Sequence, residues 1–379
     1  MLPFTVTAQD PESRARCGTI ETEHGTVSTP TFMAVGTRAT VTGMDPTDLE
    51  HVGTQVVLGN TYHLMLRPGT ELFERVGGIH NFMGWQGPVL TDSGGYQIFS
   101  LSQDRKITEK GARFRSYIDR SMHMLSPERS IEVQSAIGSD IMMVLDECVD
   151  SRSDRATTHA AMERTHRWAL RSLAARKNPK QALFAIVQGG VIPELRKESA
   201  TFLTDHPFDG FAIGGLAVGD TRAQREDITH FAAELLPAER PRYLMGVGTP
   251  PDLLYAMLAG IDMFDCILPT NMAWQGTAFT STGRVKITRS AYTNVDEPLD
   301  AACACSTCTR FTRSYLHHLF KCREPLAPRL MSRHNLFHYH SLMAESRAAI
   351  AAGTFAAFAK EKLEAIDRHE HSEKRLGQR

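Results

Sequence analysis

The stretch Met263-Phe264-Asp265-Cys266-Ile267-Leu268-Pro269-Thr270 decides how the rest of the chain is interpreted. An apolar run that ends in a carboxylate and then a proline is typical of a buried strand whose C-terminal end opens into a loop. Residues 88–97 have the same form, because an apolar run reaches Asp92 and continues with Ser93 and two glycines that let the backbone approach a ligand. Asp265 and Asp92 are therefore candidate catalytic residues, although Asp also ends strands simply by starting turns.

Short apolar runs, each closed by a polar residue or a glycine, recur along the chain. They lie at residues 32–35, 56–58, 89–90, 141–145, 183–187, 211–213, 243–245 and 263–264. Between several of them, segments 155–176, 194–205 and 222–236 have helical periodicity. Eight buried strands alternating with helices predict an α/β fold, a closed (β/α)8 TIM barrel. The alternative, an open doubly wound sheet, needs a glycine fingerprint after its first strand, and residues 32–37 lack one.

In such a barrel the C-terminal ends of all strands lie on one face. The residues expected around a single pocket there are Asn60, Asp92, Asp146, Gln188, Gly214 and Asp265. The expected organisation is an N-terminal β ribbon (1–30), the barrel (31–290), a zinc-binding subdomain (291–345) and a C-terminal helix and tail (346–379), with an Ala-rich helix at 344–366. Residues 95–130 are too long for an ordinary loop and predict a functional insertion over the active face.

Composition limits the partners and the compartment. The 379 residues include 42 basic and 43 acidic side chains, so a nucleic acid has to be met by a local patch rather than by the overall charge. The start has no signal-peptide pattern, and no run approaches the roughly eighteen apolar residues of a membrane span. Seven cysteines without an export signal favour a cytoplasmic protein with reduced thiols, and metal binding where those thiols cluster.

The stretch Cys303-Ala304-Cys305-Ser306-Thr307-Cys308 is such a cluster. Three thiolates at this spacing can face one ion, as they do for zinc. The residues that could supply a fourth ligand are His317, His318, Cys322, His334, His338 and His340. A closed site with four ligands would be structural and would hold together a subdomain too poor in apolar residues to fold unaided. The alternative is that these cysteines bind nothing.

Six motifs keep one order over residues 10–345. They are Thr91-Asp92-Ser93-Gly94-Gly95-Tyr96-Gln97, Asp146-Glu147-Cys148, Val187-Gln188-Gly189-Gly190, Gly214-Gly215-Leu216-Ala217-Val218-Gly219, Phe264-Asp265-Cys266 and the cysteine cluster. Together they resemble the bacterial-type queuine tRNA-ribosyltransferases, also called tRNA-guanine transglycosylases. The resemblance implies a zinc-bearing (β/α)8 barrel that exchanges the wobble guanine of certain tRNAs for a 7-deazaguanine, in queuosine biosynthesis.

The resemblance also implies a role for each matched residue. Asp265 would attack the ribose C1′, and Asp92 would be the general acid/base. Ser93, Asp146, Gln188, Gly215 and Leu216 would recognise the purine edge, Tyr96 and Met245 would sandwich the base, and Cys303, Cys305, Cys308 and His334 would bind zinc. This chemistry is sound, since one carboxylate can trap an oxocarbenium-like centre while a second moves the proton. A base taken out of an anticodon loop also needs an apolar or aromatic clamp.

A local positive charge suggests how the RNA would be held. Residues 300–345 contain Arg310, Arg313, Lys321, Arg323, Arg329 and Arg333 against Asp300, Glu324 and Glu345, a net of +3. This excess predicts that the zinc subdomain, with Arg310 and Arg313, grips the tRNA backbone near the anticodon loop, and the alternative is a merely solvated basic face. Asn271 and Trp274 stand where bacterial relatives usually carry arginines directed at that loop, and Trp274 could stack on an unpaired base instead.

Several alternatives stay open. Val218 resembles the bacterial pattern and favours 7-aminomethyl-7-deazaguanine as the incoming base. The alternatives are a queuine-salvaging transglycosylase or a relative acting on a different nucleic acid. A glycoside hydrolase would also use two barrel-face carboxylates. A non-catalytic partner subunit would be expected to have lost one of them, and both are present. The resemblance further implies a homodimer formed through the zinc region.

Overall fold

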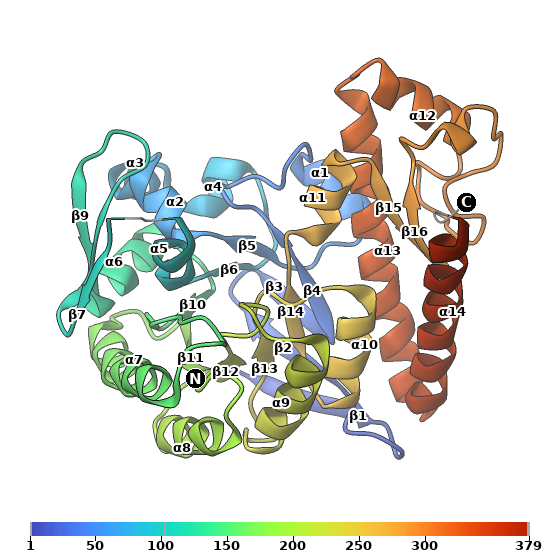
Figure 1. Cartoon of the computed structure of the whole chain (residues 1–379). Coiled ribbons are helices and arrows are strands. Elements are labelled where there is room, and N and C mark those ends of the chain that lie inside the picture. The colour runs from blue at the N-terminus through green and yellow to red at the C-terminus, as the bar shows by residue number, and fades with distance from the viewer. Residues whose placement is uncertain (1, 102–103, 377–379) are drawn as a thin grey trace.

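The computed structural model describes residues 2–101 and 104–376. In this part of the chain, eight parallel strands close into a barrel in the order β10-β11-β12-β13-β14-β4-β5-β6 (Figure 1). The strands are β4 (Thr31–Val35), β5 (Val57–Gly59), β6 (Val89–Thr91), β10 (Ile141–Met143), β11 (Ala182–Val187), β12 (Gly210–Ile213), β13 (Arg242–Leu244) and β14 (Met263–Asp265). The predicted (β/α)8 barrel is therefore confirmed, and each strand overlaps one of the eight apolar runs. Met1, residues 102–103 of the predicted insertion and residues 377–379 of the predicted tail lie outside the described residues.

The barrel closes where β14 pairs with β4, with Phe264 beside Phe32 in the register. Both phenylalanines are fully buried, as is Phe184 on β11. These strands are covered on both faces, which explains why they appear in the sequence as continuous apolar runs rather than as alternating patterns.

Helices surround the strands and are fixed at their ends by polar caps. They are α1 (Pro46–His51), α2 (Thr61–Leu66), α3 (Thr70–Val76), α4 (Ile79–Met83), α6 (Pro127–Ile137), α7 (Arg155–Ala175), α8 (Pro193–Thr204), α9 (Arg222–Glu234), α10 (Pro250–Leu258) and α11 (Leu268–Trp274). The side chains of Ser126, Asp154, Thr221 and Thr249 each accept a hydrogen bond from the third residue of the helix that follows. The helices expected at 155–176, 194–205 and 222–236 are confirmed as α7, α8 and α9.

Two small antiparallel sheets precede and interrupt the barrel. The N-terminal one has the order β1 (Phe4–Gln9), β2 (Arg16–Thr22), β3 (Gly25–Thr29). The region predicted as an insertion contains α5 (Gly95–Leu101) and a sheet of β7 (Lys106–Thr108), β8 (Gly111–Arg115) and β9 (Met122–Leu125). One face of this second sheet buries Phe114 and Leu125 against Tyr62 and Trp168. The insertion is therefore a folded unit anchored on the barrel helices.

The C-terminal part follows the barrel and lies on the opposite side of the molecule from β7 and β9 (Figure 1). It consists of β15 (Thr277–Thr280), β16 (Gly283–Lys286), the 3-10 turn η1 (Ser290–Tyr292), α12 (Arg313–Lys321), α13 (Leu326–Ala351) and α14 (Phe355–Leu376). The single helix predicted at 344–366 is wrong, because Gly353 adopts φ +68° and ends α13 before α14 begins. Alanines on both sides of this break concealed it.

Helix α13 ties the C-terminal part to the barrel. Its Asn335 side chain donates to the carbonyls of Pro269 and Thr277 at 2.8 and 3.0 Å and accepts from the N–H of Phe279 at 2.9 Å. One turn further on, the hydroxyl of Tyr339 donates to the carbonyl of Gly248 at 2.6 Å. One helix thus fixes both α11 and the loop after β13. No helix among the described residues is long and apolar enough to span a membrane.

Candidate active site

The two candidate catalytic carboxylates lie on the same face of the barrel. Asp92 directly follows β6 and Asp265 is the last residue of β14, so both stand at C-terminal ends of parallel strands. They are close enough that the charge of Asp265 contributes to raising the pKa of Asp92. The pairing expected from two distant sequence segments is therefore present in the fold.

Asp92 is a buried carboxyl held by neutral donors. Its Oδ2 accepts from the side-chain amides of Asn60 and Gln97, at 2.5 and 2.8 Å, and its Oδ1 accepts from the backbone N–H of Thr61 at 2.8 Å. Burial raises the pKa of Asp92 to about 6, against the lowering effect of these hydrogen bonds. A carboxyl group with such a pKa can both give and take a proton near neutral pH.

Asp265 has its two oxygens in different surroundings. Its Oδ1 accepts from the hydroxyl of Tyr243 at 2.6 Å and from the backbone N–H of Gly246 at 2.7 Å. Among the described residues, no donor is hydrogen-bonded to Oδ2. Burial raises the pKa of Asp265, and the bonds from Tyr243 and Gly246 oppose that rise. One oxygen is therefore anchored while the other is left to react.

A third carboxylate, Asp146, joins the predicted purine-edge residues into one network. Its Oδ1 accepts from the hydroxyl of Ser93 at 3.0 Å, and its Oδ2 accepts from the amide of Gln188 at 2.8 Å. Gly215 has φ +68°, and a Cβ there would lie 2.3 Å from the Gln188 Oε1 atom, so only glycine leaves room for this side chain. Burial raises the pKa of Asp146. Donors and acceptors for a planar polar ligand thus converge beside Asp92.

The predicted apolar clamp lies at the edge of the same face. Tyr96, on α5, is 51% exposed, while Met245, directly after β13, is half-buried and Leu216 is buried. Burial raises the pKa of Tyr96, and Cys148 and Cys266 add to that rise.

The thiols of Cys148 and Cys266 are not activated as nucleophiles. Burial raises the pKa of Cys148 strongly and that of Cys266 to about 12. Both groups are therefore protonated at neutral pH, and a protonated thiol is a poor nucleophile.

Tyr243 is the site residue that the sequence did not reveal. It belongs to the apolar run 243–245 and is completely buried, yet its hydroxyl ends on the Asp265 carboxylate. The available signal was the residue type, since a buried tyrosine usually finds a hydrogen-bond partner.

The predicted RNA-binding residues differ in how free they are. Asn271 and Trp274 lie exposed on α11, with the Trp274 indole against Gly43. Arg310 is exposed, whereas the guanidinium of Arg313 donates to the carbonyls of Pro298 and Leu299 at 2.9 and 3.0 Å. Arg329 and Arg333 form ion pairs with Asp48. Half of the predicted basic patch is therefore engaged within the protein.

Four residues in the C-terminal part form a cluster that could hold a metal ion. The Nδ1 atom of His334 lies 3.6, 3.5 and 3.2 Å from the sulfurs of Cys303, Cys305 and Cys308. Its Nε2 lies 2.7 Å from the carbonyl of Phe279, an outer contact that turns Nδ1 toward the sulfurs. Of the candidates for the fourth ligand, His334 is therefore the one beside the cysteines. Three sulfurs and one imidazole make a donor set typical of structural zinc.

A second group of possible metal ligands consists of His24, His80 and Asp140. Asp140 directly precedes β10, so this group lies at the N-terminal ends of the barrel strands, opposite the candidate active site. The two imidazoles stack with centroids 3.5 Å apart and planes 10° apart, and they approach different oxygens of Asp140 at 2.8 and 3.3 Å. The lone pair of an imidazole nitrogen lies in the plane of its ring. Because the two ring planes are nearly parallel and are stacked, the lone pairs of the two rings cannot both be directed at one ion. The two imidazoles are therefore placed to hold the Asp140 carboxylate rather than to bind a metal ion with it.

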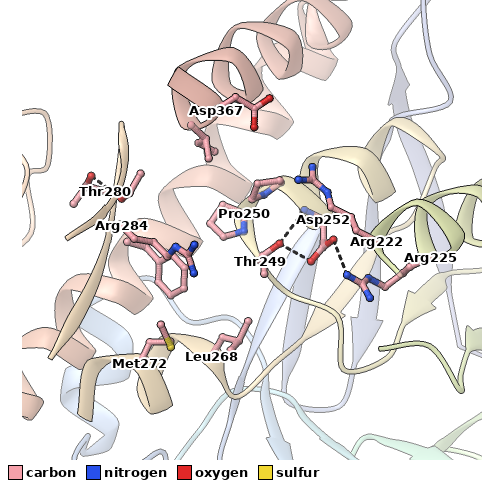
Figure 2. A pocket seen from close by; sticks show the side chains of 14 residues that line it. Arg222, Arg225, Thr249, Pro250, Asp252, Leu268, Met272, Thr280, Arg284 and Asp367 are labelled. Carbon is pink, nitrogen blue, oxygen red and sulfur yellow. Dashed lines mark hydrogen bonds and ion pairs between the residues drawn. The ribbon is translucent and has the colours of Figure 1, made fainter. Parts of the chain in front are cut away.

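A cavity of about 270 Å³ lies between α10, α11, the β15–β16 hairpin and α14 (Figure 2). Its only buried carboxylate, Asp252, accepts from the hydroxyl of Thr249 at 2.5 Å and pairs with Arg225 at 3.4 Å. Among the described residues that line it, the cavity offers no second buried carboxylate, and the two candidate catalytic carboxylates lie outside it on the barrel face.

Comparison with known proteins gives a consistent result over nearly the whole chain. The sequence profile of the family described as queuine tRNA-ribosyltransferase matches residues 10–368. The protein named queuine tRNA-ribosyltransferase from Solidesulfovibrio magneticus is 51% identical over 366 residues, which cover 96% of this chain and 98% of that protein. Proteins of the same name from Nitratidesulfovibrio vulgaris and Herpetosiphon aurantiacus are 50% and 48% identical, and the matches cover 96% and 94% of this chain and 97% and 91% of theirs.

Proposed function

Because the chain belongs to the queuine tRNA-ribosyltransferase family, we propose that it is a tRNA-guanine transglycosylase, a pentosyltransferase that replaces the wobble guanine of tRNA with a 7-deazaguanine. The observation that carries this assignment is the arrangement of one barrel face. Two carboxylates, Asp92 and Asp265, stand there with the Asp146–Gln188 pair on the strands between them. A nucleophile, a proton carrier and a purine-recognising edge thus share one site.

In the first half-reaction, the free Oδ2 of Asp265 forms a bond to the ribose C1′ while the C1′–N9 bond of guanine breaks. Asp92 in its protonated form gives its proton to the departing base. The transition state resembles an oxocarbenium ion, and the bonds from Tyr243 and Gly246 to Oδ1 keep the carboxylate aligned without occupying the attacking atom.

In the second half-reaction, the incoming base occupies the place of guanine, with Asp146, Gln188 and the backbone at Gly215 and Leu216 against its polar edge. Asp92, now ionised, takes the N9 proton. N9 bonds to C1′, the bond to Asp265 breaks, and both carboxyl groups return to their starting states. The raised pKa of Asp92, about 6, supports this double use.

For the incoming base, the loop around Val218 supports 7-aminomethyl-7-deazaguanine. The N–H of Val218 donates to Asp220 at 2.9 Å, and its carbonyl accepts from the N–H of Ser151 at 2.9 Å, so the β-branched side chain is held in place. A Val218→Gly variant would widen the pocket. A competition assay between 7-aminomethyl-7-deazaguanine and queuine tests which of them is the incoming base. The wild type should prefer the smaller aminomethyl base, and the Val218→Gly variant should lose that preference.

The RNA is held, in this proposal, by exposed groups around the barrel mouth. Arg310 contacts phosphate, and Trp274 and Asn271 face the unpaired bases of the anticodon loop. Arg313, whose guanidinium binds two carbonyls, contributes mainly by positioning its neighbours. A Trp274→Ala variant should raise the Kd for tRNA about tenfold, the usual worth of one lost stacking contact.

The metal proposed for the cysteine cluster is zinc, bound by Cys303, Cys305, Cys308 and His334. It supplies no chemistry to the reaction and stabilises the fold around β15, β16 and α13. Metal analysis should find about one zinc per chain, and His334→Ala should lose it and expose this region to limited proteolysis. We further propose a cytoplasmic homodimer, which sedimentation of the purified protein would test.

The decisive experiment is incorporation of labelled guanine into unmodified tRNA. Wild type and a surface variant of the same kind, Asp227→Asn, should incorporate the label, and Asp265→Asn should not. With wild type and no incoming base, a protein–RNA adduct should be seen on a denaturing gel, and Asp92→Ala, which lacks the proton donor, should form it more slowly. Release of guanine without incorporation would instead indicate a hydrolase. Equal incorporation by Asp265→Asn would refute the mechanism.

A further inference from the structure

The sheet β7–β9 turns one face to solvent, and the strand register fixes which side chains lie on it. Arg113 on β8 pairs with Lys106 on β7 and with Met124 on β9, and Arg115 pairs with Met122. Directly paired residues, and residues two apart on a strand, point to the same side of a sheet. All five side chains are exposed. We call this set the outer face.

The opposite face of the sheet is committed to the core. Ala112, Phe114 and Leu125 pack with Tyr62 and Trp168. Because these side chains are packed in the core, the orientation of the sheet is fixed and its outer face stays exposed to solvent. A further tie comes from the indole N–H of Trp168, which donates to the carbonyl of Glu109 in the β7–β8 turn at 3.0 Å.

The outer face is basic in a chain that is close to neutral. Residues 104–125 contain six Lys and Arg against three Asp and Glu, a net of +3, while the whole chain carries −1. One of the acidic groups, Glu109, is already paired with Arg167 at 3.0 Å. Among the described residues no acidic group forms an ion pair with Lys106 or Arg113. Two unneutralised cations thus stand beside two methionines.

The sheet is linked to the barrel mouth through Tyr117, which lies two residues beyond β8. The hydroxyl of Tyr117 lies 3.0 Å from Nδ1 of His63, and its ring stacks on Tyr62 with centroids 6.1 Å apart. Tyr62 and His63 directly follow Thr61, whose backbone N–H donates to Asp92. Figure 1 shows β7 and β9 on one side of the barrel, with α12 and the rest of the C-terminal part on the other. An RNA whose target base enters the barrel would lie between them.

We propose that the outer face is a second RNA-binding surface, which holds a strand of the tRNA on the side of the barrel mouth away from the cysteine cluster. The inference rests on the proposed function, because it takes tRNA as the polyanionic partner. Lys106 and Arg113 would contact phosphates, and the adaptable side chains of Met122 and Met124 would lie against sugar and base surfaces, while Arg115 is paired with Asp104 at 3.5 Å. Charge complementarity selects an RNA over an apolar protein partner for this face.

The test compares tRNA binding by wild type and by the double variant Lys106→Gln/Arg113→Gln over a range of salt concentrations. Each phosphate contact contributes about 0.7 to 0.9 to the slope of log K against log salt. The variant should therefore lose about 1.5 from that slope and bind tRNA roughly tenfold more weakly at low salt. Its kcat at saturating tRNA should equal that of wild type, because neither residue touches the reacting groups.

A matched control is Lys197→Gln/Lys360→Gln, which removes two exposed lysines from α8 and α14. It should leave the slope unchanged. The inference is overturned if the Lys106/Arg113 variant matches wild type in slope and affinity while both incorporate guanine, or if it changes only the oligomeric state. Loss of incorporation by the wild type itself would instead count against the proposed function.

Discussion

Carboxylates stand at both ends of the barrel strands, and their partners differ. At the C-terminal ends, Asp92, Asp146 and Asp265 are held by amides, hydroxyls and backbone N–H groups. At the N-terminal ends, Asp140, Asp209 and Asp262 lie beside imidazole or guanidinium groups. Neutral donors orient a carboxylate and leave it reactive, whereas a cationic partner ties it into the structure.

The contrast is sharpest within one strand. Asp262 and Asp265 flank β14 and are only three residues apart. The guanidinium of Arg16 donates to both oxygens of Asp262, at 3.0 and 2.7 Å, and the backbone N–H of Arg242 adds a third bond at 2.7 Å. Burial still raises the pKa of Asp262 despite this pairing, which shows how strongly the interior disfavours the charge. The two carboxyl groups beside this strand therefore differ in their partners, a guanidinium for Asp262 and neutral donors for Asp265.

The largest effect is expected for Asp265→Asn. This substitution keeps the shape of the side chain and removes the nucleophile, so guanine incorporation should fall by about 10⁴-fold. The free energy of unfolding should change little, because the amide oxygen can still accept from Tyr243. Steady-state incorporation and urea denaturation, measured on one preparation, would check both halves of the expectation. A variant that is inactive because it is unfolded would break the comparison.

Asp262→Asn should show the opposite behaviour. It leaves the buried guanidinium of Arg16 without its counter-ion and should destabilise the protein by about 3 to 5 kcal/mol. The fraction that remains folded should keep the wild-type kcat. The control is Glu234→Gln, which removes the exposed partner of Arg14 and should cost less than about 1 kcal/mol. Loss of catalysis in fully folded Asp262→Asn would erase the distinction between the two ends.

Asp92→Asn should stabilise the protein while it abolishes exchange. The folded carboxyl has a pKa of about 6 against a usual 3.8, so the folded state binds the proton more tightly and stability falls as pH rises through this window. Removing the ionisable group should raise the free energy of unfolding by about 3 kcal/mol at pH 7. The gain should vanish below about pH 3, where the carboxyl is protonated in both states. Thermal melts at about pH 3 and pH 7 would reveal it.

The smallest effect concerns acid sensitivity at the N-terminal end. Hydrogen bonds to His80 and His24 lower the pKa of Asp140 against the opposing effect of burial. Its contribution to stability is therefore present above about pH 4 and is lost as pH falls through the lowered pKa. His24→Ala should cost about 0.5 kcal/mol at pH 6, because His24 is partly exposed, and less at pH 3. Replacement of His230, whose more exposed ion pair with Glu234 is 3.5 Å long, should show a smaller difference between the two pH values.

Sequence reasoning found the barrel because its strands are buried on both faces and therefore appear as eight separate apolar runs. The acidic pair was found because each Asp ends such a run. Tyr243 was missed because its polar atom lies at the tip of a ring that otherwise belongs to the core. The sheet of the insertion was missed because its short strands alternate basic and apolar residues over only three to five positions.

The partners of individual arginine side chains could not be predicted from the sequence either. The charge count over 300–345 treated all six cations as equal, yet Arg329 and Arg333 are paired with Asp48, more than 280 residues away along the chain. Only the packing of α13 on α1 brings these groups together. Local composition therefore predicted the sign of the surface but not which side chains remain available.

Helix α13 has a consequence for how the family can vary. His334, Asn335 and Tyr339 lie within two turns of it and reach the cysteine cluster, α11 and the loop after β13. Each residue of an α-helix advances 1.5 Å and turns by about 100°, so an insertion or deletion of one residue between His334 and Tyr339 would put one of these contacts out of phase. The number of residues between His334 and Tyr339 is therefore fixed by the three partners that these side chains must reach together.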